Sequence, residues 1–135
     1  MFARKLRDPL KVRAAFDRLI PDPAGAGVAH ADVVIEAIFE NLEAKQALLR
    51  ALEARMKPGA ILATNTSSLK LEDLRTVLAH PARLVGIHFF NPVALMPLVE
   101  VVAAEGADPA MVQAACAFVK QIDKLPLPVR SAPGF

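Results

Sequence analysis

The chain has 135 residues, of which 54% are hydrophobic and 22% are charged, so we expect one compact domain with its own core and exclude a disordered tail. The formal net charge is +2, with 16 basic residues interleaved among 14 acidic ones. Because the sequence has no basic stripe and no Trp or Tyr to stack on bases, no nucleic-acid partner is predicted.

The apolar runs are strand-sized, and none approaches the roughly 20 residues that span a membrane. The basic amino end leads into Asp8 and Pro9 without an apolar stretch, so we predict no signal peptide. The single cysteine, Cys116, lies among apolar residues and indicates a small buried side chain, with no intrachain disulfide and no cysteine-based metal site. We predict a soluble, cytoplasmic protein with no membrane partner.

The first part of the chain contains two weak elements and a glycine-rich stretch. Spaced apolar residues predict a helix over about Leu6–Leu19, and a short strand over Arg18–Ile20 is expected before Pro21 closes it. Gly25–His30 superficially resembles a dinucleotide-binding fingerprint, but His30 replaces the third small residue and no strand-to-helix turn surrounds it. We predict a flexible loop there.

Strands and helices then alternate. Val33–Ile38 is an apolar, β-branched run that indicates a strand buried on both faces in the middle of a sheet. A helical period follows over Asn41–Lys57, and Ala60–Thr64 is a second buried strand. A short helix is expected over Leu71–Leu78.

Two further strands, Leu84–Phe90 and Leu98–Ala103, are separated by only seven residues. This is too short for a helical crossover, so the two strands are predicted to form an antiparallel hairpin. Asp108 is a well-formed N-cap for a helix that ends near Ile122. A last strand over Leu125–Val129 is interrupted by prolines and belongs at a sheet edge.

This order of elements predicts an α/β fold with a mostly parallel, doubly wound sheet. Ligands of such sheets bind at the carboxyl ends of the strands. Three polar clusters occupy those positions: Glu40–Asn41, Asn65–Ser68 and His88–Asn91.

A hairpin symmetric about Ala94 places His88 opposite Glu100, because each lies six residues from the midpoint. A carboxylate beside an imidazole orients the ring and stabilises its charged form, which suits a general base for a hydroxyl proton. Spacing alone favours the simpler alternative, a histidine hydrogen-bonded at a strand end with Glu100 in solvent.

Other polar side chains allow two interpretations. The hydroxyls and amide of Thr64–Ser68 could orient a substrate oxygen or a nicotinamide amide, although turn and capping chemistry is the commoner explanation. Glu40 and Lys45 could contact the ribose of a nucleotide, and a solvated first helical turn explains them equally well.

Four blocks in this order and spacing resemble the L-3-hydroxyacyl-CoA dehydrogenase family: Val34–Asn41, Ala63–Leu69, Gly86–Pro92 and Pro97–Val102. The resemblance covers nearly everything from about residue 17 to the end, and is close to the dehydrogenase portion of bacterial multifunctional fatty-oxidation enzymes. It implies a Rossmann-like sheet, NAD as cofactor, and oxidation of L-3-hydroxyacyl-CoA to 3-ketoacyl-CoA in fatty-acid β-oxidation. A sugar-acid dehydrogenase of the same broad fold is disfavoured, because those enzymes resemble one another around a catalytic lysine.

The resemblance also implies roles for individual residues. His88 matches the general base that takes the 3-hydroxyl proton, and Glu100 matches the carboxylate paired with it. Ser67 matches a residue that contacts both substrate and cofactor, and Asn91 matches one near the nicotinamide and the reacting carbon. These four positions are the implied catalytic residues.

Two further positions, Glu40 and Lys45, match cofactor contacts, and with Ser67 and Asn91 they complete the implied cofactor-binding set. No metal is implied. The sequence departs from the family in lacking its first βαβ unit with the glycine-rich turn. It also ends where the family enters an all-helical domain.

We therefore expect a partial Rossmann-like sheet, the carboxyl-side part of an NAD-binding domain, with an acyl-CoA substrate and weak or no activity by itself. An exposed sheet edge invites self-association or a homodimer. The alternative is a non-catalytic truncated remnant that acts at most as a protein-interaction module.

Overall fold

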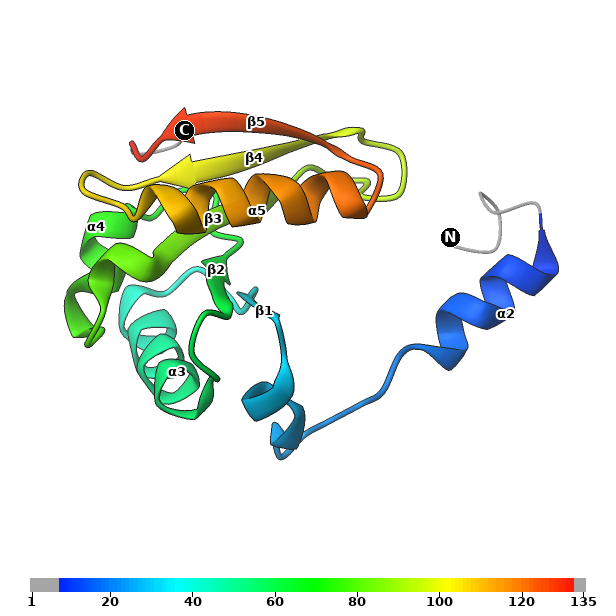
Figure 1. The fold of residues 1–135 in the computed structure, drawn as a ribbon, viewed down its shortest axis with the longest axis horizontal. Helices are drawn as coiled ribbons and strands as arrows, with labels where there is room; N and C mark the ends of the chain where they lie inside the picture. Colours follow the sequence, from blue (N-terminus) through cyan, green and yellow to red (C-terminus); the bar gives the residue numbers. More distant parts are fainter. Residues whose placement is uncertain (1–7, 133–135) are drawn as a thin grey trace.

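The computed structural model describes residues 8–132, which form one mixed five-stranded sheet with the strand order β1-β2-β3-β4-β5 (Figure 1). The strands are β1 (Val33–Glu36), β2 (Ile61–Thr64), β3 (Leu84–Phe89), β4 (Leu98–Ala103) and β5 (Leu125–Arg130). The pairs β1–β2, β2–β3 and β4–β5 are parallel, and β3–β4 is antiparallel. The predicted mostly parallel α/β sheet with an antiparallel hairpin is confirmed.

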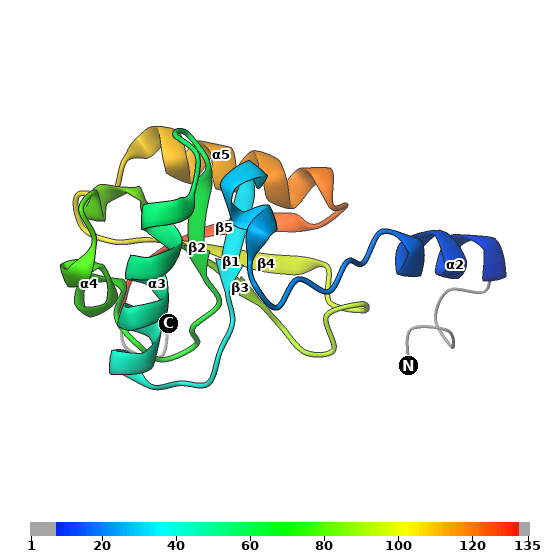
Figure 2. The same ribbon diagram turned by 90° about the horizontal axis from the view of Figure 1, so that it is seen from below.

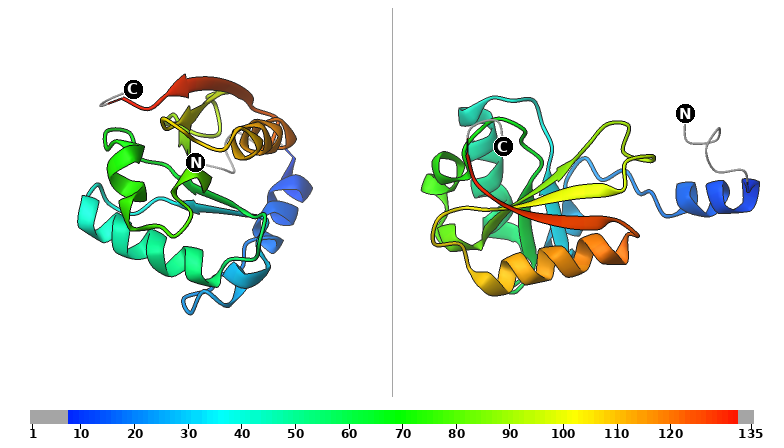
Figure 3. Two further views of the ribbon diagram at one scale, coloured as in Figure 1. Left: turned by 60° about the vertical axis from the view of Figure 1, so that its left-hand side comes forward. Right: turned by 90° about the horizontal axis from the view of Figure 1, so that it is seen from above.

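The helices cover both faces of this sheet (Figures 2 and 3). The described α-helices are α2 (Pro9–Asp17), which lies apart from the sheet, α3 (Leu42–Arg55), α4 (Leu71–Leu74) and α5 (Pro109–Gln121), with short 3-10 helices at Ala26–His30, Arg75–Val77 and Pro81–Arg83. Helices α3 and α4 pack on one face and α5 packs on the other. These two layers leave the carboxyl ends of β1, β2 and β3 uncovered.

The alternation of side chains along the strands builds a core on each face. Leu62 and Leu84 point toward α3 and α4, whereas Ala63 and Val85 point toward α5. All four side chains are fully buried. This two-sided burial explains why the central strands read as continuous apolar runs.

The helices α3 and α5 begin at the predicted positions, each after a residue whose side chain caps the first turn. The Asp108 carboxylate accepts a hydrogen bond from the Ala110 amide at 3.0 Å, ahead of Pro109 at the first helical position. The Asn41 side chain accepts one from the Ala44 amide at 2.9 Å. Asn41 thereby ends the loop after β1, which lines the site described below.

Strand β1 lies at the edge of the sheet, so its predicted central position is wrong. Within residues 8–132 it pairs with β2 alone, and Val33, Val34 and Ile35 are only half-buried. Apolar periodicity reports that a strand can be covered on both faces, but it does not report how many neighbours the strand has.

The predicted strand at Arg18–Ile20 does not form. This segment continues from α2 into an extended connection that carries the helix away from the sheet (Figures 1 and 2). No described strand lies beside it to supply the hydrogen bonds that a strand requires. The predicted start of the helix at Leu6 lies outside the described residues, and α2 begins at Pro9.

The predicted flexible loop at Gly25–His30 is an ordered 3-10 helix over Ala26–His30. The Asp22 carboxylate accepts hydrogen bonds from the amides of Gly27 at 2.7 Å and Ala26 at 3.1 Å, and these bonds lower the pKa of Asp22. Gly25 supplies the positive φ of +69° that starts the turn. The glycines therefore serve a side-chain-capped turn.

Among the described residues, no helix is long and apolar enough to cross a membrane.

Candidate active site at the carboxyl ends of the strands

The β3–β4 hairpin places His88 directly opposite Glu100, as its predicted symmetry requires. The His88 Nδ1 atom lies 3.1 Å from Glu100 Oε2, and the two side chains are 15% and 12% exposed. A carboxylate at this distance makes Nδ1 the proton donor of the neutral ring, so Nε2 is the nitrogen that can take a proton. The Phe90 ring packs against the imidazole at an interplanar angle of 64°, with centroids 5.0 Å apart.

The hairpin carries this pair because β3 and β4 approach closely at Gly86. A Cβ atom at position 86 would lie 2.6 Å from the Val102 Cβ atom, on the residue that pairs with it. Two residues farther along the same strands come His88 and Glu100. Glycine at this position thus permits the pairing that aligns them.

A pocket of about 340 Å³ opens beside His88, at the carboxyl ends of β1, β2 and β3. It is lined by Ala37, Ile38, Phe39, Glu40, Asn65, Ser67, His88, Phe89, Phe90 and Asn91. The structure therefore brings together four predicted site residues from three segments of the chain: Glu40, Ser67, His88 and Asn91. Glu100 reaches the pocket through His88, and Lys45 lies outside its lining.

Glu40 is a carboxylate at the rim of this pocket, with its side chain 37% exposed. Its Oε2 atom accepts hydrogen bonds from Thr66 Oγ1 at 2.7 Å and Ser68 Oγ at 2.8 Å, and Lys45 Nζ lies 3.2 Å from its Oε1. Partial burial by itself raises the pKa of Glu40, but these hydrogen bonds outweigh it and hold the pKa below its ordinary value. Glu40 therefore presents a negative acceptor to the pocket at neutral pH.

Lys45 is buried, so the alternative of a solvated first helical turn is wrong for this residue. Its side chain is 1% exposed, and its Nζ donates to Glu36 Oε1 at 2.6 Å and to the Ile38 carbonyl at 2.9 Å. The ammonium lies beneath the pocket and contacts two residues that line it, Ile38 through its carbonyl and Glu40 through its carboxylate.

Within the Thr64–Ser68 cluster, some side chains cap the turn and others line the pocket. Thr66 caps the turn, because its Oγ1 accepts the Leu69 amide at 3.1 Å. Asn65 and Ser67 instead line the pocket, and Asn65 Oδ1 accepts the Phe89 amide at 3.0 Å. Asn65 thus ties the end of β2 to the end of β3.

Sequence reasoning assigned no role to Glu36, although this residue lies at the centre of the polar contacts below the pocket. Its carboxylate also accepts a hydrogen bond from Thr64 Oγ1 at 2.6 Å. The available signal was a single acidic residue in an otherwise apolar strand, since such a buried charge requires partners.

A larger cavity of about 820 Å³ lies at the opposite, amino-terminal ends of β2 and β3, where Met56, Gly59 and Arg83 contribute to its wall. Although it is larger than the pocket beside His88, we do not identify it as the active site. Ligands of doubly wound sheets bind at the carboxyl ends of the strands, not at the amino ends. None of the site residues predicted from the sequence lines this cavity.

The pocket at the carboxyl ends fits the nicotinamide end of a dinucleotide cofactor. Glu40 can accept from ribose hydroxyls, and the Ser67 hydroxyl and Asn91 amide can each bond a carboxamide or a reacting oxygen. Within residues 8–132 no glycine-rich turn joins a strand to a helix, so the fit does not extend to the pyrophosphate.

The class defined by this fold and site is that of Rossmann-like dehydrogenases. The family described as "3-hydroxyacyl-CoA dehydrogenase, NAD binding domain" matches residues 2–132, and the chain belongs to this family of NAD-dependent enzymes. The predicted family and cofactor class are confirmed.

The curated relatives are longer proteins. The fatty acid oxidation complex subunit alpha of Pseudomonas putida F1 is 40% identical over 127 residues, which is 94% of this chain and 18% of that protein. The subunit of the same name from Psychrobacter sp. PRwf-1 is 38% identical over 135 residues, or 100% of this chain and 19% of that protein. The chain therefore spans less than a fifth of the curated relatives it matches.

Solved structures agree with the fold. The 3-hydroxybutyryl-CoA dehydrogenase of Escherichia coli K12 superposes with a TM-score of 0.91 at 35% identity, covering 99% of this chain and 30% of that one. The (S)-3-hydroxybutyryl-CoA dehydrogenase of Ralstonia eutropha gives 0.90 at 32% identity, covering 99% and 48%.

Proposed function

We propose that this chain carries the proton-abstracting half of an NAD-dependent oxidation of L-3-hydroxyacyl-CoA to 3-ketoacyl-CoA in fatty-acid β-oxidation. The observation that carries the proposal is the His88–Glu100 pair, held across a hairpin and opening on a pocket with Glu40, Ser67 and Asn91. Membership of the chain in the dehydrogenase family supports it.

His88 acts as the general base. With Nδ1–H directed at Glu100, the Nε2 atom takes the proton of the 3-hydroxyl group as that oxygen becomes a carbonyl. Glu100 holds the ring in this tautomer and stabilises the imidazolium that forms. NAD, when bound, supplies the acceptor for the hydride that leaves carbon 3.

Ser67 and Asn91 orient the reacting groups from two sides of the pocket. Their hydroxyl and amide provide donors and acceptors for the substrate oxygen and for the nicotinamide carboxamide. Glu40 accepts from a ribose hydroxyl, and Lys45 contributes on the cofactor side through its contact with Glu40. Holding the reactants in this way lowers the entropic part of the barrier.

We assign residues 1–135 to the carboxyl-side part of an NAD-binding domain, leaving pyrophosphate binding and the rest of the acyl-CoA site to other residues. The unpaired edge of β1 supports self-association or a homodimer through strand pairing, because its outward amides and carbonyls have no described strand partner. A cytoplasmic location belongs to the same proposal.

Titration of the chain with NADH, followed by its fluorescence, tests the cofactor part. We expect saturable binding that weakens in Ser67→Ala and Asn91→Ala but not in Asp32→Asn, which removes an exposed carboxylate at the other end of β1. Absence of saturation up to about millimolar NADH, a weak affinity on the scale of ligand binding, would exclude binding by this chain alone.

A further inference from the structure

Glu36 is the most completely buried acidic side chain among the described residues, and the mechanism above does not use it. Its carboxylate accepts three hydrogen bonds: from Lys45 Nζ at 2.6 Å, from Thr64 Oγ1 at 2.6 Å and from the Ile38 amide at 2.7 Å. A buried carboxylate without such partners would be strongly unfavourable. Glu36 is therefore fully satisfied by groups from three different segments.

Those segments meet under the pocket. Lys45 belongs to α3, Thr64 ends β2, and Ile38 lies in the loop of residues 37–41 that joins β1 to α3. Lys45 also donates to the Ile38 carbonyl at 2.9 Å, so both backbone polar groups of Ile38 are bound to the Glu36–Lys45 pair. The pair thus binds the second residue of the loop through both of its backbone polar groups.

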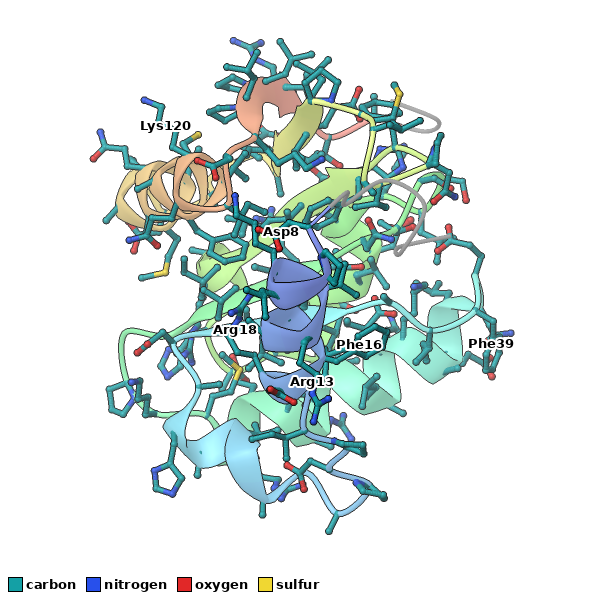
Figure 4. The ribbon with its side chains drawn as sticks, turned by 90° about the vertical axis from the view of Figure 1, so that its right-hand side faces the viewer. Asp8, Arg13, Phe16, Arg18, Phe39 and Lys120 are labelled. Atoms are coloured by element: carbon teal, nitrogen blue, oxygen red, sulfur yellow. The ribbon has the colours of Figure 1, made fainter. Side chains whose placement is uncertain are left out.

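Apolar packing does not fix the 37–41 loop in the way that the hydrogen bonds to Ile38 do. Phe39 is 71% exposed, and Figure 4 shows it at the outer surface of the molecule. Ile38 is also exposed. The conformation of the loop therefore depends on polar contacts, and four of its five residues line the pocket beside His88.

The charges reinforce this dependence. One ammonium, on Lys45, lies between two carboxylates, with Glu36 at 2.6 Å and Glu40 at 3.2 Å. The Glu40 carboxylate also accepts hydrogen bonds from the Thr66 and Ser68 hydroxyls, which keep it directed toward the pocket. Glu36 is the carboxylate nearer to the Lys45 ammonium. Without Glu36, the ammonium would be drawn toward Glu40, its nearest remaining carboxylate.

We propose that Glu36 is a positioning residue for the cofactor side of the pocket, which acts by holding Lys45 and the 37–41 loop in place. This rests on the proposed function insofar as the pocket receives the nicotinamide end of NAD. Glu36 touches neither substrate nor cofactor, and its effect passes through Lys45, Ile38 and Glu40.

The test compares Glu36→Gln with Asp32→Asn in the full chain. Glutamine keeps the size of the side chain but cannot neutralise Lys45. Asp32→Asn removes a carboxylate from the other end of β1, where it is exposed and paired with the exposed Lys57. Amide hydrogen exchange reports loop opening, and NADH titration reports the pocket.

We expect Glu36→Gln to speed exchange of the 37–41 amides, and to raise the NADH dissociation constant, each by about tenfold, the effect of losing one charged hydrogen bond. Exchange in β3 and α5 should stay at the parent rate, and Asp32→Asn should change neither readout. Unchanged loop exchange, or equal acceleration across the whole chain, would overturn the proposal.

A wild-type chain that fails to bind NADH would exclude cofactor binding by this chain alone, while loop exchange would still decide whether Glu36 holds the loop. If the wild type binds NADH and Glu36→Gln opens the loop without weakening binding, the positioning role is wrong. Should Glu36→Gln not fold, Thr64→Val replaces it, because this variant removes one hydrogen bond to Glu36 and leaves the charges paired. Its loop exchange is then read against the same two outcomes.

Discussion

The hairpin and the β1 edge hold their charged side chains in different ways. In the hairpin, backbone pairing on both strands sets His88 against Glu100, so the contact follows from register. Strand β1 pairs with β2 as its one described neighbour, and Glu36, Lys45 and Glu40 are held together by contacts between their side chains. The pocket therefore combines a His–Glu pair aligned by the backbone with a rim carboxylate, Glu40, that is held through a buried charge pair.

The largest expected effect is on the hairpin side. In a longer dehydrogenase that contains this chain, His88→Ala should lower kcat for 3-hydroxybutyryl-CoA oxidation by about 10²- to 10⁴-fold, because the proposed general base is removed. NADH formation measures the rate, and His80→Ala, at the other end of β3, is the matched control. A comparable loss of acyl-CoA binding would show that His88 serves binding instead of proton transfer.

On the β1 side, the expected effect is a loss of unfolding free energy. Lys45→Met leaves the Glu36 carboxylate buried without its counter-charge, and breaking such a pair costs about 3–5 kcal/mol of unfolding free energy. Glu100→Gln should cost less, because that pair is partly exposed and the amide can still bond His88. Urea unfolding of both variants compares them, and equal losses would erase the distinction between the two regions.

Close backbone approach can be tested at Gly86. Gly86→Ala places a Cβ atom 2.6 Å from the Val102 Cβ atom, so the strands must move apart, at a cost of about 1–3 kcal/mol. Thermal unfolding measures the loss, and the His88–Glu100 contact should loosen with it. A variant with unchanged stability would mean that register does not depend on this contact.

The smallest effect concerns pH at the rim. Partial burial alone raises the pKa of Glu40, but hydrogen bonds from Thr66, Ser68 and Lys45 lower it below the ordinary value of 4.5. A carboxyl with a lowered pKa stabilises the fold above its unfolded pKa, and that stability is lost as the pH falls through the folded pKa. Glu40→Gln should therefore flatten the acid side of the stability profile, measured by thermal unfolding from about pH 7 to pH 3. A profile identical to that of the wild type would contradict this.

Much of the hairpin could be predicted from local rules. A seven-residue connection excludes a crossover, and its symmetry about Ala94 pairs position 88 with position 100. The Asp108 cap and the proline-bearing edge strand β5 also follow from neighbouring residues. These features form as expected because each depends on contacts over short stretches of chain.

The errors arose where a side chain binds backbone amides or where a partner strand is needed. Gly25–His30 is ordered because the Asp22 carboxylate, on the preceding turn, binds its amides. Arg18–Ile20 lacks a described strand to pair with, and among the described strands β1 has one neighbour instead of two. Periodicity describes the faces of a segment but not its edges.

By itself, the sequence determined the order of the elements, the hairpin register and the gathering of polar residues at the strand ends, because these depend on residue types and short spacings. Only the tertiary structure decided that Lys45 is buried and that Glu36 binds it. Their contact joins a strand to the following helix across nine positions, and its burial depends on how α3 packs against the sheet. Burial of a charge is a property of the assembled layers, so it cannot be read from a local pattern.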